Sequence, residues 1–205
     1  MVIAHLLIPV YGRELSRWVR PEEFMTVTAL LTLVFILCLE GGTAPELRLT
    51  SRPVQSWGWW VRLACGFGLV IAVISVVVVG FLWAIGRPMP IPRASPSALP
   101  ARLFAFCVFA PVVEELIYRG FLTQALAGTM GTWGLIVTSG VVFGLLHVLY
   151  GNPGPDNLVA GFFLQWAFLK SGSILVPMAM HAAGNALAVT SHVVNWHLFP
   201  VGVAS

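Results

Sequence analysis

Long apolar stretches separated by short polar loops are the feature that most constrains the fold of this chain of 205 residues. An apolar stretch of about 20 residues matches the thickness of a bilayer's hydrocarbon core when it forms an α-helix. Inside that core every backbone N–H and C=O needs a partner within the protein, and a helix supplies these partners itself. Charged residues make up only 9% of the chain, against about 25% in soluble domains. The sequence therefore predicts an all-α, polytopic transmembrane helical bundle.

The distribution of the apolar stretches predicts about six membrane segments. Five of them are residues 24–39, 60–85, 102–126, 133–150 and 174–194. The sixth, 158–169, has about twelve residues, whereas an ordinary span needs about twenty. We expect this segment to be short and tilted, re-entrant, or extended into Lys170 as a full span.

A proline-rich linker at 86–100 separates two parts of the chain. We expect accessory membrane segments and the linker in 1–99, a functional core in 100–195 and a tail in 196–205. If every stretch spans the membrane, six basic residues lie on the side of the N-terminus and four on the opposite side. This difference favours a cytoplasmic N-terminus, because cytoplasmic loops carry an excess of Lys and Arg. The net charge is +3, and the basic residues are spread over the loops instead of forming a surface for nucleic acid. Such residues can bind lipid headgroups, so membrane lipids are the expected partners.

Three charged residues, Glu114, Glu115 and Arg119, interrupt the apolar stretch 102–126. Each charged side chain at the middle of a membrane helix costs roughly 2.5–3.5 kcal/mol on translocon scales. Glu115 and Arg119 are four residues apart, with the acid first, which is the favourable order for an ion pair along a helix. Glu114 is turned by about 100° from Glu115 and can face a different neighbour. We therefore expect Glu114 to carry chemistry, and Glu115 and Arg119 to support it.

Other features of the apolar stretches suit a polar cavity. Pro111 removes one helical hydrogen bond, which is expected to free the Cys107 carbonyl and to bend the helix just before the glutamates. Gly140 and Gly144 form a G-x-x-x-G step, which allows a neighbouring helix to approach closely. His147 follows that step, and His181 and Asn185 share one face of the last helix because they are four residues apart.

The residue types leave two chemistries open. In one, Glu114, His147 and His181 bind Zn²⁺, a set of ligands known in zinc hydrolases. In the other, no metal takes part: Glu114 and His147 activate water, while His181 and Asn185 donate hydrogen bonds to an oxyanion. Asn185 could also serve only to hold neighbouring helices together by a hydrogen bond, worth roughly 1 kcal/mol. The sequence pattern makes no cofactor certain.

The three motifs, in their order along the chain, resemble the CPBP family. They are E-E-x-x-x-R at 114–119, F-x-x-x-H at 143–147 and H-x-x-x-N at 181–185. This family comprises CAAX proteases and bacteriocin-processing enzymes and is also called the Abi family. The segment 171–177, which leads into the last motif, is similar as well. The resemblance covers about residues 100–195.

The resemblance implies an all-helical intramembrane endopeptidase. It implies that Glu114 and His147 form the water-activating pair. His181 and Asn185 would stabilise the oxyanion or, in the metal alternative, His181 would be a ligand. Glu115 and Arg119 carry over as supporting residues. The family is labelled a metalloprotease family, and a glutamate-type mechanism without catalytic metal has also been argued for it.

The expected reaction is hydrolysis of a peptide bond by water activated at Glu114 and His147, in a prokaryotic cell membrane. The substrate is expected to be a membrane-associated protein or a lipidated, leader or sorting-tag peptide. The main alternative is a non-proteolytic membrane scaffold of the same fold, such as an immunity or transport accessory protein. That alternative predicts that Glu114→Gln leaves the phenotype intact.

Overall fold

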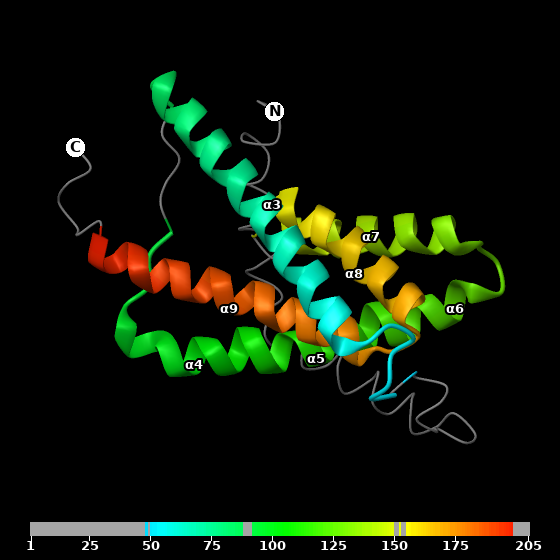
Figure 1. Cartoon of the computed structure of the whole chain (residues 1–205). Helices are drawn as coiled ribbons and strands as arrows, with labels where there is room; N and C mark the ends of the chain where they lie inside the picture. The colour runs from blue at the N-terminus through cyan, green and yellow to red at the C-terminus, as the bar shows by residue number, and fades with distance from the viewer. Residues whose placement is uncertain (1–47, 49, 88–91, 150–151, 153–154, 199–205) are drawn as a thin grey trace. The chain divides into compact units, whose positions relative to one another are not determined.

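The computed structural model describes residues 48, 50–87, 92–149, 152 and 155–198, and all regular structure in these residues is helical (Figure 1). The α-helices are α3 (Trp57–Ala84), α4 (Leu99–Phe104), α5 (Ala110–Glu115), α6 (Thr123–Ala127), α7 (Thr132–Leu149), α8 (Pro155–Ser171) and α9 (Leu175–Leu198). Tighter or wider helical turns are η1 (Pro96–Ala98), η2 (Ala105–Phe109) and η3 (Leu116–Leu122). The all-α prediction is confirmed. The predicted segment 24–39 lies outside the described residues.

Three helical stretches of the described chain are long and apolar enough to cross a membrane. They are Trp57–Ala84, Pro96–Ala127 and Thr132–Leu149. Most large apolar side chains of α3 are exposed, among them Leu69, Val76 and Phe81, as expected for a helix that faces lipid. These stretches correspond to three of the predicted membrane segments, and the fold is that of a helical membrane protein.

The last two helices differ from those three. α8 has 17 residues, about 26 Å at 1.5 Å per residue, and so falls slightly short of a hydrocarbon core of about 30 Å. It extends the predicted short segment 158–169 at both ends and includes Lys170 in its last turn. α9 is long enough, with 24 residues, but carries His181, Asn185 and other polar groups among its apolar ones. Whether α8 spans the membrane stays a prediction.

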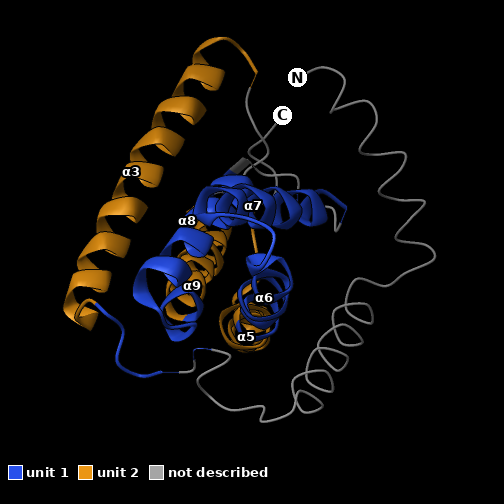
Figure 2. Ribbon diagram, turned by 90° about the vertical axis from the view of Figure 1, so that its right-hand side faces the viewer, with its two compact units in different colours: residues 1–54, 112–178 blue, residues 55–111, 179–205 orange. Residues whose placement is uncertain are grey.

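The chain forms two compact units, which Figure 2 shows in different colours. The first comprises Met1–Val54 and Val112–Met178, and the second comprises Gln55–Pro111 and Ala179–Ser205. The first unit contains α6, α7 and α8, and the second contains α3 and α4. α5 and α9 each begin in one unit and end in the other. The functional division at residue 100 stays a prediction.

In the first unit, α7 and α8 lie side by side and are joined through glycines (Figure 1). A Cβ atom added to Gly161 would lie 2.9 Å from the Gly140 carbonyl oxygen and 3.0 Å from its Cα. A Cβ atom added to Gly144 would lie 3.2 Å from the Leu158 Cα. These contacts are with backbone atoms, which cannot move aside as a side chain can. The close approach predicted for the G-x-x-x-G step is confirmed.

The segment that precedes α3 is fastened to the turn between α8 and α9, also within the first unit. The Ile174 N–H donates to the Arg48 carbonyl at 3.0 Å, and the Val54 N–H donates to the Ser171 carbonyl at 2.9 Å. Gly172 has a φ of +67°, which an L side chain rarely adopts. The conformation of this turn therefore explains the glycine in the S-G-S sequence at 171–173.

In the second unit, the helix around Pro111 differs from the expectation. The turn Ala105–Phe109 is π-helical, so its hydrogen bonds join residues five apart, and the Ala110 N–H donates to the Ala105 carbonyl. In this register the carbonyl that Pro111 fails to pair belongs to Phe106. The expectation for the Cys107 carbonyl assumed α-helical spacing throughout and stays a prediction.

We expect Gly161→Ala to destabilise the protein, because the new methyl group meets backbone of α7. Overpacking of this kind costs typically about 1–3 kcal/mol. The measurement is the midpoint of thermal unfolding in detergent. The matched control is Gly66→Ala in α3, where an added Cβ meets nothing within 4 Å. Equal midpoints for the two variants would contradict the close packing of α7 on α8.

Candidate active site

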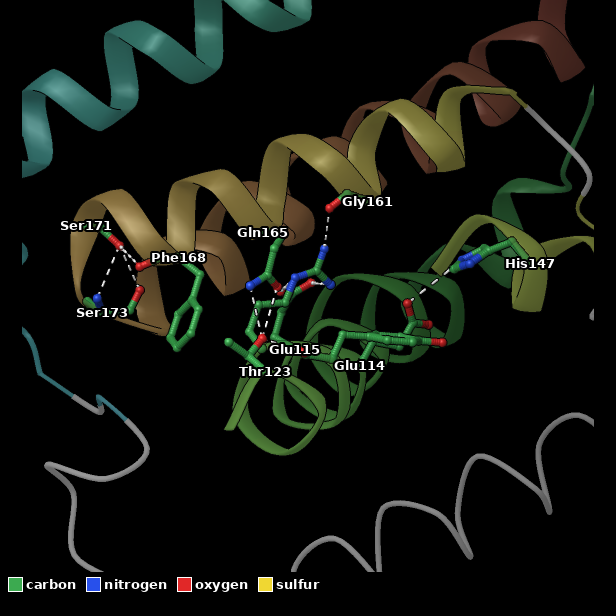
Figure 3. A network of polar contacts seen from close by, with 11 residues as sticks. Glu114, Glu115, Thr123, His147, Gly161, Gln165, Phe168, Ser171 and Ser173 are labelled. Atoms are coloured by element: carbon green, nitrogen blue, oxygen red, sulfur yellow. Dashed lines mark hydrogen bonds and ion pairs between the residues drawn. The ribbon is translucent and has the colours of Figure 1, made fainter. Parts of the chain in front are cut away.

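Glu115 and Arg119 form an ion pair that is sealed inside the first unit (Figure 3). The Arg119 Nε and the Glu115 Oε2 are 3.1 Å apart, and both side chains are 0% exposed. The Arg119 Nη1 also donates a hydrogen bond to Glu115 Oε1 at 3.2 Å. The i, i+4 spacing seen in the sequence therefore produces the expected pair. Both charges are neutralised locally, as burial of charged groups requires.

Arg119 also joins its own helix to α7 and α8. Its Nη2 donates to the Gly161 carbonyl oxygen of α8 at 3.0 Å. Its guanidinium carbon lies 5.0 Å from the centre of the Phe143 ring of α7 and 5.6 Å from that of Tyr118. A cation within about 6 Å of an aromatic ring is attracted by the negative face of the ring. One buried arginine thus holds three helical segments at a fixed spacing.

Glu114 faces away from this pair, towards His147 of α7 (Figure 3). The Glu114 Oε2 and the His147 Nε2 are 3.8 Å apart. Their side chains are 11% and 13% exposed, unlike the sealed pair beside them. The distance is beyond a direct hydrogen bond and within the range of an ion pair. The two polar atoms therefore face each other at the edge of the packed core.

The orientation of His147 is fixed by Phe143, one helical turn earlier. The His147 Nδ1 lies 2.9 Å from the Phe143 carbonyl oxygen. A carbonyl oxygen can only accept, so this hydrogen bond places a hydrogen on Nδ1. In the neutral ring, Nε2 then carries the lone pair, and it is Nε2 that faces Glu114. The two rings are also stacked, with centroids 4.3 Å apart.

Phe143 therefore links the two parts of the site. Its ring is 1% exposed and contacts His147 on one side and the Arg119 guanidinium on another. Tyr118 packs edge-on against the same ring at 5.0 Å. The F-x-x-x-H spacing thus has a physical role: the phenylalanine supplies both the ring and the backbone carbonyl that hold the histidine.

His181 and Asn185 belong to the second unit, on α9. The Asn185 Nδ2 donates a hydrogen bond to the Phe106 carbonyl oxygen at 2.6 Å. The structure brings Glu114 together with His147, and Glu115 together with Arg119. The roles predicted for His181 and Asn185 stay predictions.

The zinc alternative requires three donors. Glu114 and His147 would supply two, and the hydrogen bond from Nδ1 to a backbone carbonyl is the outer contact that a metal-bound histidine usually makes. Among the residues that the structure describes, no three His, Cys, Asp or Glu side chains gather into a metal-binding group. The donor set that the described residues bring together is therefore incomplete. His181 as third ligand stays a prediction.

Two polar residues of this region were not singled out from the sequence. Gln165 of α8 and Thr123 of α6 are both buried, and the Gln165 Nε2 donates to the Thr123 Oγ1 at 3.0 Å. The Thr123 hydroxyl in turn donates to the Tyr118 carbonyl at 2.9 Å. A glutamine in the middle of an apolar segment was a visible signal. The Gly161 carbonyl that accepts from Arg119 has no such signal, because every residue has a carbonyl.

The fold and the site define an all-helical membrane protein with ionisable side chains held between its helices. Residues 96–187 match the family model described as type II CAAX prenyl endopeptidase Rce1-like. The matched region contains all three motifs and runs from η1 into α9. The family resemblance predicted from those motifs is thereby confirmed over residues 96–187.

A curated relative supports the same relationship. The chain is 34% identical over 96 residues to the uncharacterized protein YyaK of Bacillus subtilis (strain 168). The matched region covers 40% of this chain and 31% of that protein. The chain thus spans about a third of the length of the curated relative that it matches. No solved structure gives a significant match.

We expect Arg119→Met to destabilise the protein strongly, because it leaves the Glu115 carboxylate buried without its cation. Removing one partner of a buried pair costs about 3–5 kcal/mol. The double variant Glu115→Met/Arg119→Met removes both charges and should recover part of that loss. The measurement is the midpoint of thermal unfolding in detergent for both variants. A double variant that unfolds at a lower temperature than Arg119→Met would contradict the role of the pair.

Proposed function

We propose that this protein is an intramembrane endopeptidase that hydrolyses a peptide bond with water activated at Glu114 and His147. The observation that carries the proposal is the facing pair of Glu114 Oε2 and His147 Nε2, 3.8 Å apart at the edge of the core. The match of residues 96–187 to an endopeptidase family supports the same reaction type.

The two neighbouring carboxylates support this assignment because their surroundings differ. Glu115 is paired with Arg119, and its side chain is 0% exposed, so its charge is already compensated. Glu114 lies against a histidine whose own orientation is held by Phe143. A general base needs a lone pair, access to water and a fixed direction. The hydrogen bond to Phe143 fixes the direction of the His147 ring and leaves a lone pair on its Nε2, and access of water to the pair is part of the proposal.

In the proposed reaction, a water molecule between Glu114 and His147 gives up a proton to this pair. Its oxygen attacks the carbonyl carbon of the scissile peptide bond, which produces a tetrahedral oxyanion. The C–N bond then breaks, and the proton held by the pair passes to the leaving nitrogen. The products are a carboxylic acid and an amine, so one water is consumed for each bond. His181 and Asn185 are the proposed donors to the oxyanion.

The proposed substrate is a membrane-associated protein or a lipidated, leader or sorting-tag peptide. The family that matches is named for prenyl endopeptidases that act on CAAX sequences, whose substrates are lipidated. Glu114 and His147 lie within helical stretches long and apolar enough to cross a membrane, which favours a membrane-associated substrate. The proposed location is a prokaryotic cell membrane, with membrane lipids as partners.

The proposal is tested by comparing peptide termini in host membranes that contain either the wild-type protein or Glu114→Gln. The change replaces one oxygen by an NH₂ group and removes the base while keeping the shape. We expect new termini with the wild-type protein only, because the amide cannot take up the proton of the attacking water. These termini would identify the substrate as well.

The matched control is Asp156→Asn, the same chemical change at an exposed acid in the first turn of α8. It should give the termini of the wild-type protein. If the wild type and Glu114→Gln gave identical termini at equal amounts of protein in the membrane, the proposed protease activity would be contradicted. The scaffold alternative would then be favoured.

The metal alternative has its own test, since Zn²⁺ would require His181 as a ligand beside Glu114 and His147. The zinc content of the purified protein is measured for the wild type and for His181→Ala. One zinc per chain that is lost in His181→Ala would establish the metal reading. For the glutamate-type reaction we expect less than a tenth of one zinc per chain in both proteins.

A further inference from the structure

Pro111 leaves one carbonyl group of its own helix without its usual donor. In the π-helical turn Ala105–Phe109, the Ala110 N–H donates to the Ala105 carbonyl. The next bond in this register would run from residue 111 to the Phe106 carbonyl, but proline has no N–H. An unpaired carbonyl is costly within a membrane, because no water is present to replace the missing donor. The Phe106 carbonyl therefore needs a partner from elsewhere in the chain.

Asn185 of α9 supplies that partner. Its Nδ2 donates to the Phe106 carbonyl oxygen at 2.6 Å, slightly shorter than the usual range of about 2.7–3.2 Å for N–H···O hydrogen bonds. The two residues are 79 positions apart in the sequence, so the bond joins two distant segments of the second unit. A side-chain amide carries two N–H hydrogens, and one of them is used here. The carbonyl orphaned by a proline is thus paired by an asparagine of another helix.

We propose that Asn185 is a positioning residue whose amide replaces the hydrogen bond that Pro111 removes. In this role it fixes the π-helical turn, which ends two residues before Pro111 and therefore just ahead of Glu114 in the sequence. The role differs from donation to an oxyanion, which would use the second amide hydrogen. Its effect on structure does not depend on the proposed function, whereas its effect on rate does.

The same helix offers an internal comparison in Asn195. Its Nδ2 donates to the Pro92 carbonyl oxygen at 3.1 Å. Pro92 lies in the linker before η1, outside any helix, so no helical N–H has been removed from its carbonyl. Asn195 therefore joins α9 to another segment without replacing a helical hydrogen bond. A merely helix-joining role for Asn185 would make the two asparagines behave alike.

The test is a double-mutant cycle between Asn185→Ala and Pro111→Ala, read as the midpoint of thermal unfolding in detergent. Pro111→Ala returns an N–H that can pair with the Phe106 carbonyl. We expect Asn185→Ala to lower the midpoint by about 2–4 °C in the wild-type background, the shift expected for one lost hydrogen bond. In the Pro111→Ala background the loss should be less than half as large.

Asn195→Ala serves as the matched control and should lower the midpoint equally in both backgrounds. An equal loss for Asn185→Ala with and without Pro111 would overturn the proposal. If Asn185→Ala yields no folded protein, the amount of folded protein in the Pro111→Ala background is the readout. Recovery in the double variant supports the proposal, and failure in both backgrounds overturns it.

Peptide cleavage gives a second readout that separates positioning from oxyanion donation. If Asn185 positions the turn, Pro111→Ala should restore at least part of the cleavage lost in Asn185→Ala. If Asn185 acts only on the oxyanion, the added backbone N–H cannot restore the rate, and that result overturns the positioning role. If the wild-type protein cleaves nothing, the proposed function fails, while the unfolding cycle still decides the role of Asn185.

Discussion

The buried Arg119 cation is the constraint on which the rest of the first unit depends. A charge in a membrane helix persists only where partners satisfy it, and Arg119 has three kinds of partner. Glu115 supplies the opposite charge, the Gly161 carbonyl accepts a hydrogen bond, and the rings of Phe143 and Tyr118 face the guanidinium. These partners come from its own helix, α8 and α7. Because the geometry of a guanidinium is planar and rigid, it holds these elements at defined distances.

This arrangement explains why α7 and α8 must approach so closely. Arg119 donates to the Gly161 carbonyl, and Gly161 itself packs against the Gly140 backbone. The glycines and the arginine are thus parts of one construction. A further buried hydrogen bond, from Gln165 to Thr123, joins α8 to α6. Arg119 with Glu115 and Gln165 with Thr123 are thus paired within the protein, which suits a chain embedded in lipid.

The buried ion pair of Glu115 and Arg119 also leaves Glu114 to face a different neighbour. Two adjacent glutamates on one helix face different directions, and the cation is committed to Glu115. The Phe143 ring packs against both Arg119 and His147, so the arginine also helps to hold the histidine in place. Glu114 and His147 therefore face each other from elements that the ion pair has already fixed. A preorganised pair of this kind loses little energy in aligning itself with a substrate.

Features of the fold and site that depend only on the spacing of residues along one helix could be predicted from the sequence. The ion pair of Glu115 and Arg119 follows from i, i+4 spacing, and the close approach of α7 and α8 follows from Gly140 and Gly144. Three membrane-spanning stretches of the described chain followed from the apolar composition, although the bounds of α8 did not. The family followed from three ordered motifs, each of which has a fixed spacing.

What could not be predicted depends on contacts between distant residues or on a change of helical register. The π-helical turn before Pro111 was not predicted, because α-helical spacing was expected throughout this segment. The acceptor at Gly161 is a backbone atom, to which no residue type points. Gln165 was visible as a polar residue in an apolar segment, but its partner Thr123 lies 42 positions away. The roles of His181 and Asn185 in the reaction stay predictions.

The central claim is that two adjacent carboxylates have separate duties, and it is tested most directly by making the same change at each. Glu114→Gln and Glu115→Gln are compared for the midpoint of thermal unfolding and for the peptide termini produced in membranes. The account requires Glu114→Gln to keep the midpoint of the wild type and lose the termini, whereas Glu115→Gln should unfold at a markedly lower temperature. The contrary result is a Glu114→Gln variant that unfolds early, or one that still produces the termini. Termini produced by Glu114→Gln would show that Glu114 does not activate water, and early unfolding would show that its role is not separate from that of Glu115.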